Sequence, residues 1–263
     1  MKVTVCELPN EAKALEIAWG ELAEHVQAQD SELVLLPEMP FFRWLAHTRD
    51  VDAGQWEQAV EAHEAWIARL TDLAPVSSPK GATVISTRPI TANGKRQNAG
   101  YIWEPGGEAR TVHTKYYLPD EADFWEASWY ERGDGDFSLA DTSKGVVGLL
   151  ICTELWFNHH AREYGKQGMQ ILACPRATPR RTAPKWITGG QAAAVVSGAY
   201  CLSSNLAGKT PEGGDYAGIG WIIEPGEGTV LGLTSPDQPF LTLDIDLEKA
   251  DKAKKTYPRY VLE

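Results

Sequence analysis

The sequence predicts an α/β protein built as a four-layer α-β-β-α sandwich, in which two mixed β-sheets pack together and helices cover the outer faces. Three observations lead to this prediction. Short apolar strands alternate with helical patterns, which indicates parallel strands joined by crossover helices. Each half of the chain ends in a hairpin pattern around a Pro-Gly turn. No glycine-rich dinucleotide motif follows the first strand, which disfavours one doubly wound sheet.

The first half of the chain begins with an apolar strand and a helical segment. Asn10 is a plausible N-cap for that helix, in which Leu15, Leu22 and Val26 recur at helical spacing. The predicted elements, in chain order, are a strand at 2–8, a helix at 11–29, a strand at 32–38, a helix at 51–73, a strand at 81–87 and two strands within 98–115. The strand at 32–38 has a continuous apolar core, as expected of a strand buried on both faces.

The second half has a similar outline. The predicted elements are a strand at 145–152, a helix at 156–166, a strand at 169–175, a helix at 184–199 that begins with proline, a strand at 200–205 and two strands within 218–233. The segments "YIWEPGGE" and "WIIEPGEG" occupy similar places in the two halves. This is a weak repeat of architecture, and we expect residues 1–263 to form one domain.

Composition limits the partners of the protein. Of 263 residues, 36 are Asp or Glu and 25 are Lys or Arg, which gives a net charge of −11. This charge argues against a broad surface for nucleic acid or anionic membranes. Residues 1–10 have no apolar region typical of a secretory signal, and no apolar run approaches the roughly 18 residues that span a bilayer. We therefore expect a cytoplasmic protein.

The cysteine and histidine patterns do not indicate a metal site. The 4 cysteines, Cys6, Cys152, Cys174 and Cys201, form no C-x-x-C pair, and we interpret them as reduced thiols. His159 and His160 are adjacent on a predicted helix, so they point in different directions. We expect neither a metal nor a cofactor.

Three reactive side chains stand at the ends of predicted strands. Glu38 lies at the end of the strand at 32–38, just past its apolar part, Lys115 follows an alternating strand, and Cys152 ends an apolar strand. Ligands of layered α/β folds bind beyond the carboxyl ends of parallel strands, so the three could converge. A thiol needs a base at neutral pH, and Glu38 could take its proton. Lys115, helped by the backbone N–H of Thr153, could stabilise an oxyanion.

Each of these residues also has an ordinary structural interpretation. Taken alone, Cys152 is most simply a core thiol, Glu38 a loop charge and Lys115 a solvated strand-end charge. A histidine could be the base in place of Glu38, as in Cys–His enzymes. The combination of all three at strand ends favours the catalytic interpretation.

The segments around these residues resemble a known family. "LLPEMPFF", "HTKYYLPDEADFWEASWYERGDGDF" and "GLLICTELWFNHHAREYGKQGMQILACPRAT" are similar to the three catalytic boxes of the nitrilase superfamily of carbon–nitrogen hydrolases. The resemblance covers almost the whole chain and implies the same sandwich. It implies that Glu38 is the general base, Lys115 the oxyanion stabiliser and Cys152 the nucleophile. It also implies a second glutamate, for which Glu126 is our choice and Glu121 the rival.

The sequence departs from the family pattern in two places. Thr114 precedes the lysine, where Arg or Ser is frequent in the family. The segment Cys152-Thr153-Glu154-Leu155 contains the nucleophile, whereas true nitrilases have a segment similar to Cys-Trp-Glu-Asn at this place. The second departure favours amides over nitriles as substrates.

Four further residues are candidates for the pocket. Trp125 and Phe157 are the aromatics that we expect nearest the substrate, although packing explains them equally well. Arg176, just past a strand, could grip a substrate carboxylate. Glu154 could line the site or brace Lys115.

The sequence thus predicts an amidase without metal or cofactor that hydrolyses a small-molecule amide through a cysteine thioester. The alternatives are an N-carbamoyl amidohydrolase, a nitrilase, or a non-catalytic binding protein that kept the fold. The resemblance also implies a homodimer or higher homo-oligomer. The apolar C-terminal residues support this expectation: Tyr257, Tyr260, Val261 and Leu262.

Overall fold

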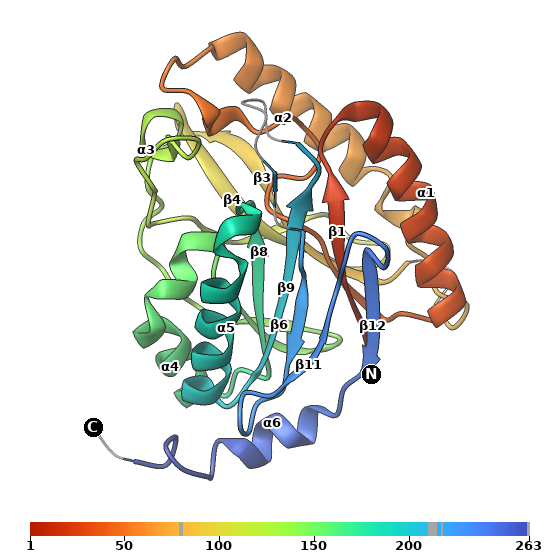
Figure 1. Ribbon diagram of the computed structural model, residues 1–263, viewed down its shortest axis with the longest axis vertical. Helices are drawn as coiled ribbons and strands as arrows, with labels where there is room; N and C mark the ends of the chain where they lie inside the picture. The colour runs from red at the N-terminus through yellow and green to blue at the C-terminus, as the bar shows by residue number, and fades with distance from the viewer. Residues whose placement is uncertain (79–80, 210–214, 217, 262–263) are drawn as a thin grey trace.

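The computed structural model describes residues 1–78, 81–209, 215–216 and 218–261 (Figure 1). Leu262, which we included in the apolar C-terminal segment, lies outside these residues. Strands occupy the middle of the molecule, with α1 (Ala12–Gln29) on one side and α4 (Asn158–Lys166) with α5 (Ala183–Ser197) on the other. The protein therefore has an α/β fold with a mixed sheet and outer helices.

The remaining elements of the first half are β1 (Lys2–Pro9), β2 (Leu33–Leu35), η1 (Leu45–His47), α2 (Ala53–Ile67), η2 (Leu70–Asp72), β3 (Thr83–Ala92), β4 (Lys95–Trp103) and β5 (Arg110–Thr114). The helix expected at 51–73 is therefore an α-helix followed by a short 3₁₀ turn. The strand expected at 32–38 is hydrogen-bonded over only three residues.

The remaining elements of the second half are α3 (Glu126–Trp129), β6 (Ala140–Thr142), β7 (Gly145–Leu149), η3 (Cys152–Trp156), β8 (Ile171–Arg176), η4 (Arg180–Thr182), β9 (Tyr200–Ala207), β10 (Trp221–Ile223), β11 (Val230–Leu233), β12 (Phe240–Asp244) and α6 (Leu247–Ala253). The predicted strands and helices of both halves are present. α3, β6, β12 and α6 are additional to the prediction.

The strands of the described residues are linked into one sheet of 12 strands, in the order β5-β4-β3-β2-β1-β9-β8-β7-β6 with β10, β11 and β12 attached beside it. β1 joins the two halves, because Val3–Val5 pair with β2 while Glu7–Pro9 pair with β9, both in parallel. The prediction of two separate sheets is therefore not confirmed. What the structure supports is one mixed, nearly closed sheet with helices around it.

Strands from the two halves share one apolar core. Val3 and Leu35 from the first half belong to the same buried cluster as Leu149 and Leu202 from the second. β4 and β7 approach so closely that a Cβ added to Gly100 would overlap the Leu149 side chain. A glycine is therefore required at position 100 by packing, because no side chain fits between the strands.

Helix α1 covers the opposite face of β1 and β2. Its buried residues Leu15, Trp19, Leu22 and Val26 follow the predicted helical spacing. The N-cap is Glu11, whose side chain accepts a hydrogen bond from Ala14 N at 3.0 Å. The predicted cap Asn10 is therefore wrong by one residue, because the chain turns into the helix one position later.

Candidate active site

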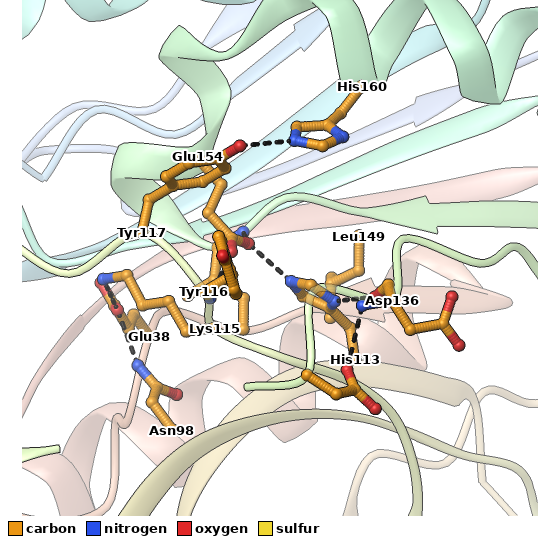
Figure 2. A network of polar contacts seen from close by, with 12 residues as sticks. Glu38, Asn98, His113, Lys115, Tyr116, Tyr117, Asp136, Leu149, Glu154 and His160 are labelled. Carbon is orange, nitrogen blue, oxygen red and sulfur yellow. Dashed lines mark hydrogen bonds and ion pairs between the residues drawn. The ribbon is translucent and has the colours of Figure 1, made fainter. Parts of the chain in front are cut away.

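The three predicted strand-end residues meet in the structure. Glu38 lies three residues beyond β2, Lys115 directly follows β5, and Cys152 opens η3 after β7. Lys115 Nζ donates a hydrogen bond to Glu38 Oε1 at 2.7 Å (Figure 2). Because β2 and β7 run toward the same region of the molecule, segments far apart in the sequence supply one site.

Lys115 is held between two carboxylates. Besides its bond to Glu38, Nζ donates to both oxygens of Glu126, at 2.8 and 2.6 Å. The lysine side chain has no exposed surface. Burial lowers the pKa of Lys115, but the charges of Glu126 and Glu38 outweigh this effect and raise the pKa overall. Lys115 is therefore an ammonium over the whole working pH range.

Glu38 has one engaged oxygen and one unengaged oxygen. Oε1 accepts from Asn98 Nδ2 at 2.8 Å and from Lys115. Oε2 is buried and has no hydrogen-bond partner within the described residues. A buried carboxylate oxygen without a partner is unfavourable unless a reacting group uses it. Its position suits an acceptor for a proton.

Glu126 and Glu121, the two candidates for the second glutamate, occupy different places. Glu126 begins the short helix α3 and holds Lys115 with both oxygens. Burial raises the pKa of Glu126, and the charge of Lys115 acts in the opposite direction. Glu121 is exposed and lines the same cavity as Glu126 and Cys152. The geometry thus favours Glu126 as the residue that positions Lys115.

Cys152 has an unusual backbone conformation. Its φ of 49° lies in the left-handed region, which residues other than glycine rarely adopt. β7 ends at Leu149, so the chain leaves the sheet before Cys152 and turns sharply into η3. Burial and the charge of Glu38 raise the pKa of the thiol, whereas Lys115 lowers it, and the overall pKa is raised. The resting thiol is therefore neutral and needs a base.

A cavity of about 370 Å³ opens onto Cys152. It is lined by Pro119, Glu121, Phe124, Glu126, Cys152, Thr153, Trp156, Ala177, Thr178, Pro179, Arg181, Thr182, Lys185 and Trp186. Its volume suits a small molecule. Its walls combine aromatic rings with two cationic side chains.

The aromatics that line the cavity are not the ones that we predicted. Phe124, Trp156 and Trp186 line it. The predicted Trp125 instead lies under the guanidinium of Arg49, 3.8 Å from the ring centre. The predicted Phe157 stacks on Tyr117 with ring centres 3.5 Å apart. Each prediction missed by one residue, because adjacent side chains in a turn point in different directions.

Arg176 does not reach the cavity. Its guanidinium donates to Ser203 Oγ at 2.7 Å, Thr178 Oγ1 at 2.8 Å and Ile219 O at 2.7 Å, and it lies 4.0 Å from the ring centre of Trp221. Burial lowers its pKa to about 10. Arg176 is thus a buried structural cation, and the prediction that it grips a substrate carboxylate is wrong. Arg181 and Lys185 are the cations that line the cavity.

Glu154 holds the backbone beside Lys115 and Cys152. Its carboxylate is fully buried and accepts two backbone hydrogen bonds, each of 2.8 Å. One comes from the N–H of Tyr116, the residue after Lys115, and the other from the N–H of Ile151, the residue before Cys152. Of the two roles that the sequence left open, the structure favours bracing. Thr153, whose N–H follows the nucleophile, lines the cavity.

The described residues contain neither a metal-binding cluster nor a membrane-spanning helix. In that part of the chain, no three His, Cys, Asp or Glu side chains are grouped so that they could hold a metal ion. None of the helices there has the length and apolar character needed to cross a bilayer.

Solved structures share the fold over nearly the whole chain. A carbon-nitrogen hydrolase from Helicobacter pylori G27 superposes with a TM-score of 0.85 at 22% identity, covering 98% of this chain and 94% of that one. An amidase from Nesterenkonia sp. AN1 superposes with a TM-score of 0.76 at 18% identity and the same coverage. At such identities the likeness establishes the fold.

The curated relatives match over a smaller share of their own length than the solved structures do. Omega-amidase NIT2 of Mus musculus is 29% identical over 171 residues, 63% of this chain and 61% of that protein. The chloroplastic omega-amidase of Arabidopsis thaliana is 23% identical over 242 residues, 89% of this chain and 64% of that protein. The chain thus spans about three fifths of the length of the curated relatives it matches. The model of the carbon-nitrogen hydrolase family matches residues 2–255, and the chain belongs to that family.

Proposed function

We propose that the protein hydrolyses a small-molecule amide to a carboxylic acid and ammonia through a thioester on Cys152. The observation that carries the proposal is the buried Glu38, which is bonded to Lys115 through one oxygen and has its other oxygen unengaged beside a neutral thiol. The relatives support it by their names, because several are omega-amidases. A structure of the Nesterenkonia amidase, which carries the acetamide moiety of fluoroacetamide on its active-site cysteine, also supports it.

The first step is attack of the Cys152 sulfur on the amide carbon. Glu38 takes the thiol proton during the attack, because the raised thiol pKa leaves almost no thiolate beforehand. The carbonyl oxygen becomes an oxyanion, for which Lys115 Nζ and the backbone N–H of Thr153 are the donors that we propose.

Proton transfer to Glu38 also prepares Lys115 for this role. In the resting site all three N–H bonds of Lys115 are engaged by Glu38 and Glu126. When Glu38 is protonated it loses its charge, and its attraction for the ammonium weakens. One N–H of Lys115 then turns to the oxyanion, so the hydrogen-bond donor becomes available as the negative charge forms on the oxygen.

Collapse of the intermediate completes acylation. Glu38 returns its proton to the leaving nitrogen, ammonia departs, and the acyl group stays on sulfur. Water then enters, gives a proton to Glu38 and attacks the thioester. The acid leaves as the Cys152 thiol is restored by the same proton, so all protons balance.

The cavity limits the acyl group. We infer an amide whose acyl part contacts the aromatic walls formed by Phe124, Trp156 and Trp186. An acyl group that bears a distal carboxylate remains the alternative, favoured by Arg181 and Lys185 on the same cavity. N-carbamoyl amino acids belong to this anionic class.

A substrate panel tests the proposal. Ammonia release is measured for phenylacetamide, short aliphatic amides, monoamides of dicarboxylic acids, N-carbamoyl amino acids and the matching nitriles. We expect amides to exceed their nitriles in kcat/KM, because Thr153 and Leu155 stand where the Trp and Asn of the nitrilase pattern Cys-Trp-Glu-Asn would be. Turnover of a nitrile faster than its amide would contradict the assignment.

We further propose a cytoplasmic homodimer whose strands form the four-layer sandwich of the family. The core shared by strands of both halves supports the layering. The exposed Tyr257 and Tyr260 support association, because large apolar surfaces are unfavourable in water. Four buried free thiols suit a reducing compartment. A monomeric mass in light scattering at micromolar concentration would exclude the dimer.

A further inference from the structure

A buried ion pair is bonded to the backbone next to two of the proposed catalytic residues, Lys115 and Cys152. His113 Nε2 and Glu154 Oε2 are 2.8 Å apart, and neither side chain has more than 1% exposed surface (Figure 2). His113 is two residues before Lys115, so both side chains project from the same face of the chain leaving β5. Glu154 is likewise two residues after Cys152. The pair therefore joins the segment that carries Lys115 to the segment that carries Cys152.

Glu154 connects the two segments that hold the reacting groups. One oxygen accepts from Tyr116 N, and the other accepts from Ile151 N and from His113, each at 2.8 Å. A rotation of this carboxylate would release the backbone on both sides of the site. The orientation of Glu154 thus fixes the separation of Lys115 from Cys152.

The contacts of His113 determine its protonation state. Nδ1 lies 3.0 Å from Asp136 O, and Nε2 faces the Glu154 carboxylate. Both neighbours are acceptors, so both ring nitrogens must carry a proton to donate. A neutral imidazole can satisfy only one of them. The geometry therefore requires an imidazolium.

The charges around the ring support this state. Burial lowers the pKa of His113, but the hydrogen bond and charge of Glu154, with smaller contributions from the Asp136 carbonyl and the Asp134 charge, raise it overall. His160, packed from α4, acts in the opposite direction, because the two imidazoles repel when charged. The pairing partner in β4 is Gly100, which carries no charge.

We propose that His113 is a positioning residue, which as an imidazolium locks Glu154 and through it holds Lys115 and Cys152 in reacting geometry. This inference rests on the amide hydrolysis proposed above. When the ring loses its proton, one of its two bonds is lost and the carboxylate can turn. The reacting groups then separate, and a displacement of about 1 Å can lower the rate about 10²-fold.

The variants that test the inference are His113→Gln, the nearly isosteric Glu154→Gln and their combination. His25→Gln is the matched control, because His25 bonds to Thr242 on the distant β12. We expect kcat to fall about 10- to 100-fold in both single variants, with KM within about threefold of wild type. The double variant should be no slower than the slower single one, because the residues act as one unit. His25→Gln should match wild type.

The pH profile separates positioning from a merely structural role. Because the His113 pKa is raised, its pairing is complete at low pH and is lost as the pH rises through that value. Wild-type kcat should therefore decline on the alkaline side, and this limb should be missing in His113→Gln. NMR titration of the imidazoles should show His113 above, and His25 below, the pKa of free histidine. An alkaline limb that persists in His113→Gln would overturn the inference.

A second readout does not depend on finding a substrate. Iodoacetamide alkylation of Cys152, followed by mass spectrometry, needs the thiol and its base but no amide turnover. We expect slower alkylation in both single variants than in wild type and His25→Gln. If no amide is hydrolysed but this difference appears, the proposed function fails and the positioning role stands. Equal alkylation rates in wild type and folded Glu154→Gln would overturn the positioning role.

Discussion

Glu38 Oε1 lies 2.7 Å from Lys115 Nζ, while Oε2 of the same carboxylate has no partner among the described residues. One oxygen thus orients the side chain and the other is available to a proton. Because the Cys152 thiol is neutral at rest, catalysis depends on both oxygens: Oε1 holds the carboxylate in place and Oε2 accepts the thiol proton.

The first prediction concerns that unengaged oxygen. Glu38→Gln keeps the shape of the side chain and removes its basicity, so kcat should fall about 10²- to 10⁴-fold. Steady-state ammonia release measures the effect. Glu121→Gln, a change at the rim of the same cavity, should retain kcat within about threefold. A Glu38→Gln enzyme of near-normal rate would transfer the role of base to a histidine.

The second prediction concerns the nucleophile. Cys152→Ala should abolish turnover and leave the circular dichroism spectrum unchanged, since one sulfur atom is a small loss for the core. Iodoacetamide should modify Cys152 before Cys6, Cys174 or Cys201, because only Cys152 lines the cavity. Peptide mapping after partial alkylation decides this, and earlier labelling of another cysteine would refute the assignment.

The third prediction concerns the ammonium. Lys115→Met removes the oxyanion donor and leaves Glu126 and Glu38 buried without their shared cation. We expect kcat to fall at least about 10²- to 10³-fold. The melting temperature should fall as well, because two carboxylates lose their partner. If KM rose while kcat stayed normal, Lys115 would be a substrate-binding residue instead.

The fourth prediction separates structural from pocket cations. Arg176→Met removes the three hydrogen bonds that the guanidinium donates to Ser203, Thr178 and the Ile219 carbonyl, so the free energy of unfolding should fall by at least about 2 kcal/mol. Urea titration measures it.

Arg181→Met is the control for that change. Its side chain is exposed at the cavity, so stability should stay within about 0.5 kcal/mol. If the substrate is anionic, KM should rise for Arg181→Met alone. Equal stability losses in both variants would contradict the buried role of Arg176.

The fifth prediction compares two glycines. Gly100→Ala would force a methyl group into the Leu149 side chain, so stability should fall by about 1–3 kcal/mol or more. Gly20→Ala, at an open position inside α1, should raise stability by about 0.5–1 kcal/mol. Thermal melts of the two variants check both signs. A stable Gly100→Ala protein would argue against close packing of β4 on β7.

The sequence allowed prediction of the elements whose signals are local. Alternating strands and helices followed from periodicity, and the segments with Glu38, Lys115 and Cys152 followed from charged or nucleophilic residues at strand ends. β12 could not be predicted in this way. It pairs with β1 across about the full chain length, Val3 with Leu243 for example, and nothing near either strand specifies that contact.

The mistaken side-chain roles have a common cause. A sequence shows that Arg176 follows a strand, but not that Ser203, Thr178 and Ile219 converge on its guanidinium from other segments. The aromatic wall was predicted at Trp125 and Phe157, one residue away from the Phe124 and Trp156 that line the cavity. The difference arises because the direction of a side chain in a short turn depends on backbone angles. Such angles are set by the packed fold and not by residue spacing.

The left-handed backbone of Cys152 places stability and activity in opposition. A residue with a side chain held at φ 49° stores strain on the order of 1–3 kcal/mol, which glycine would relieve. The inactive Cys152→Gly protein should therefore be more stable than inactive Cys152→Ala. Evolution in the laboratory for heat resistance alone would favour loss of the thiol. A selection for a more thermostable enzyme therefore has to measure turnover in the same screen.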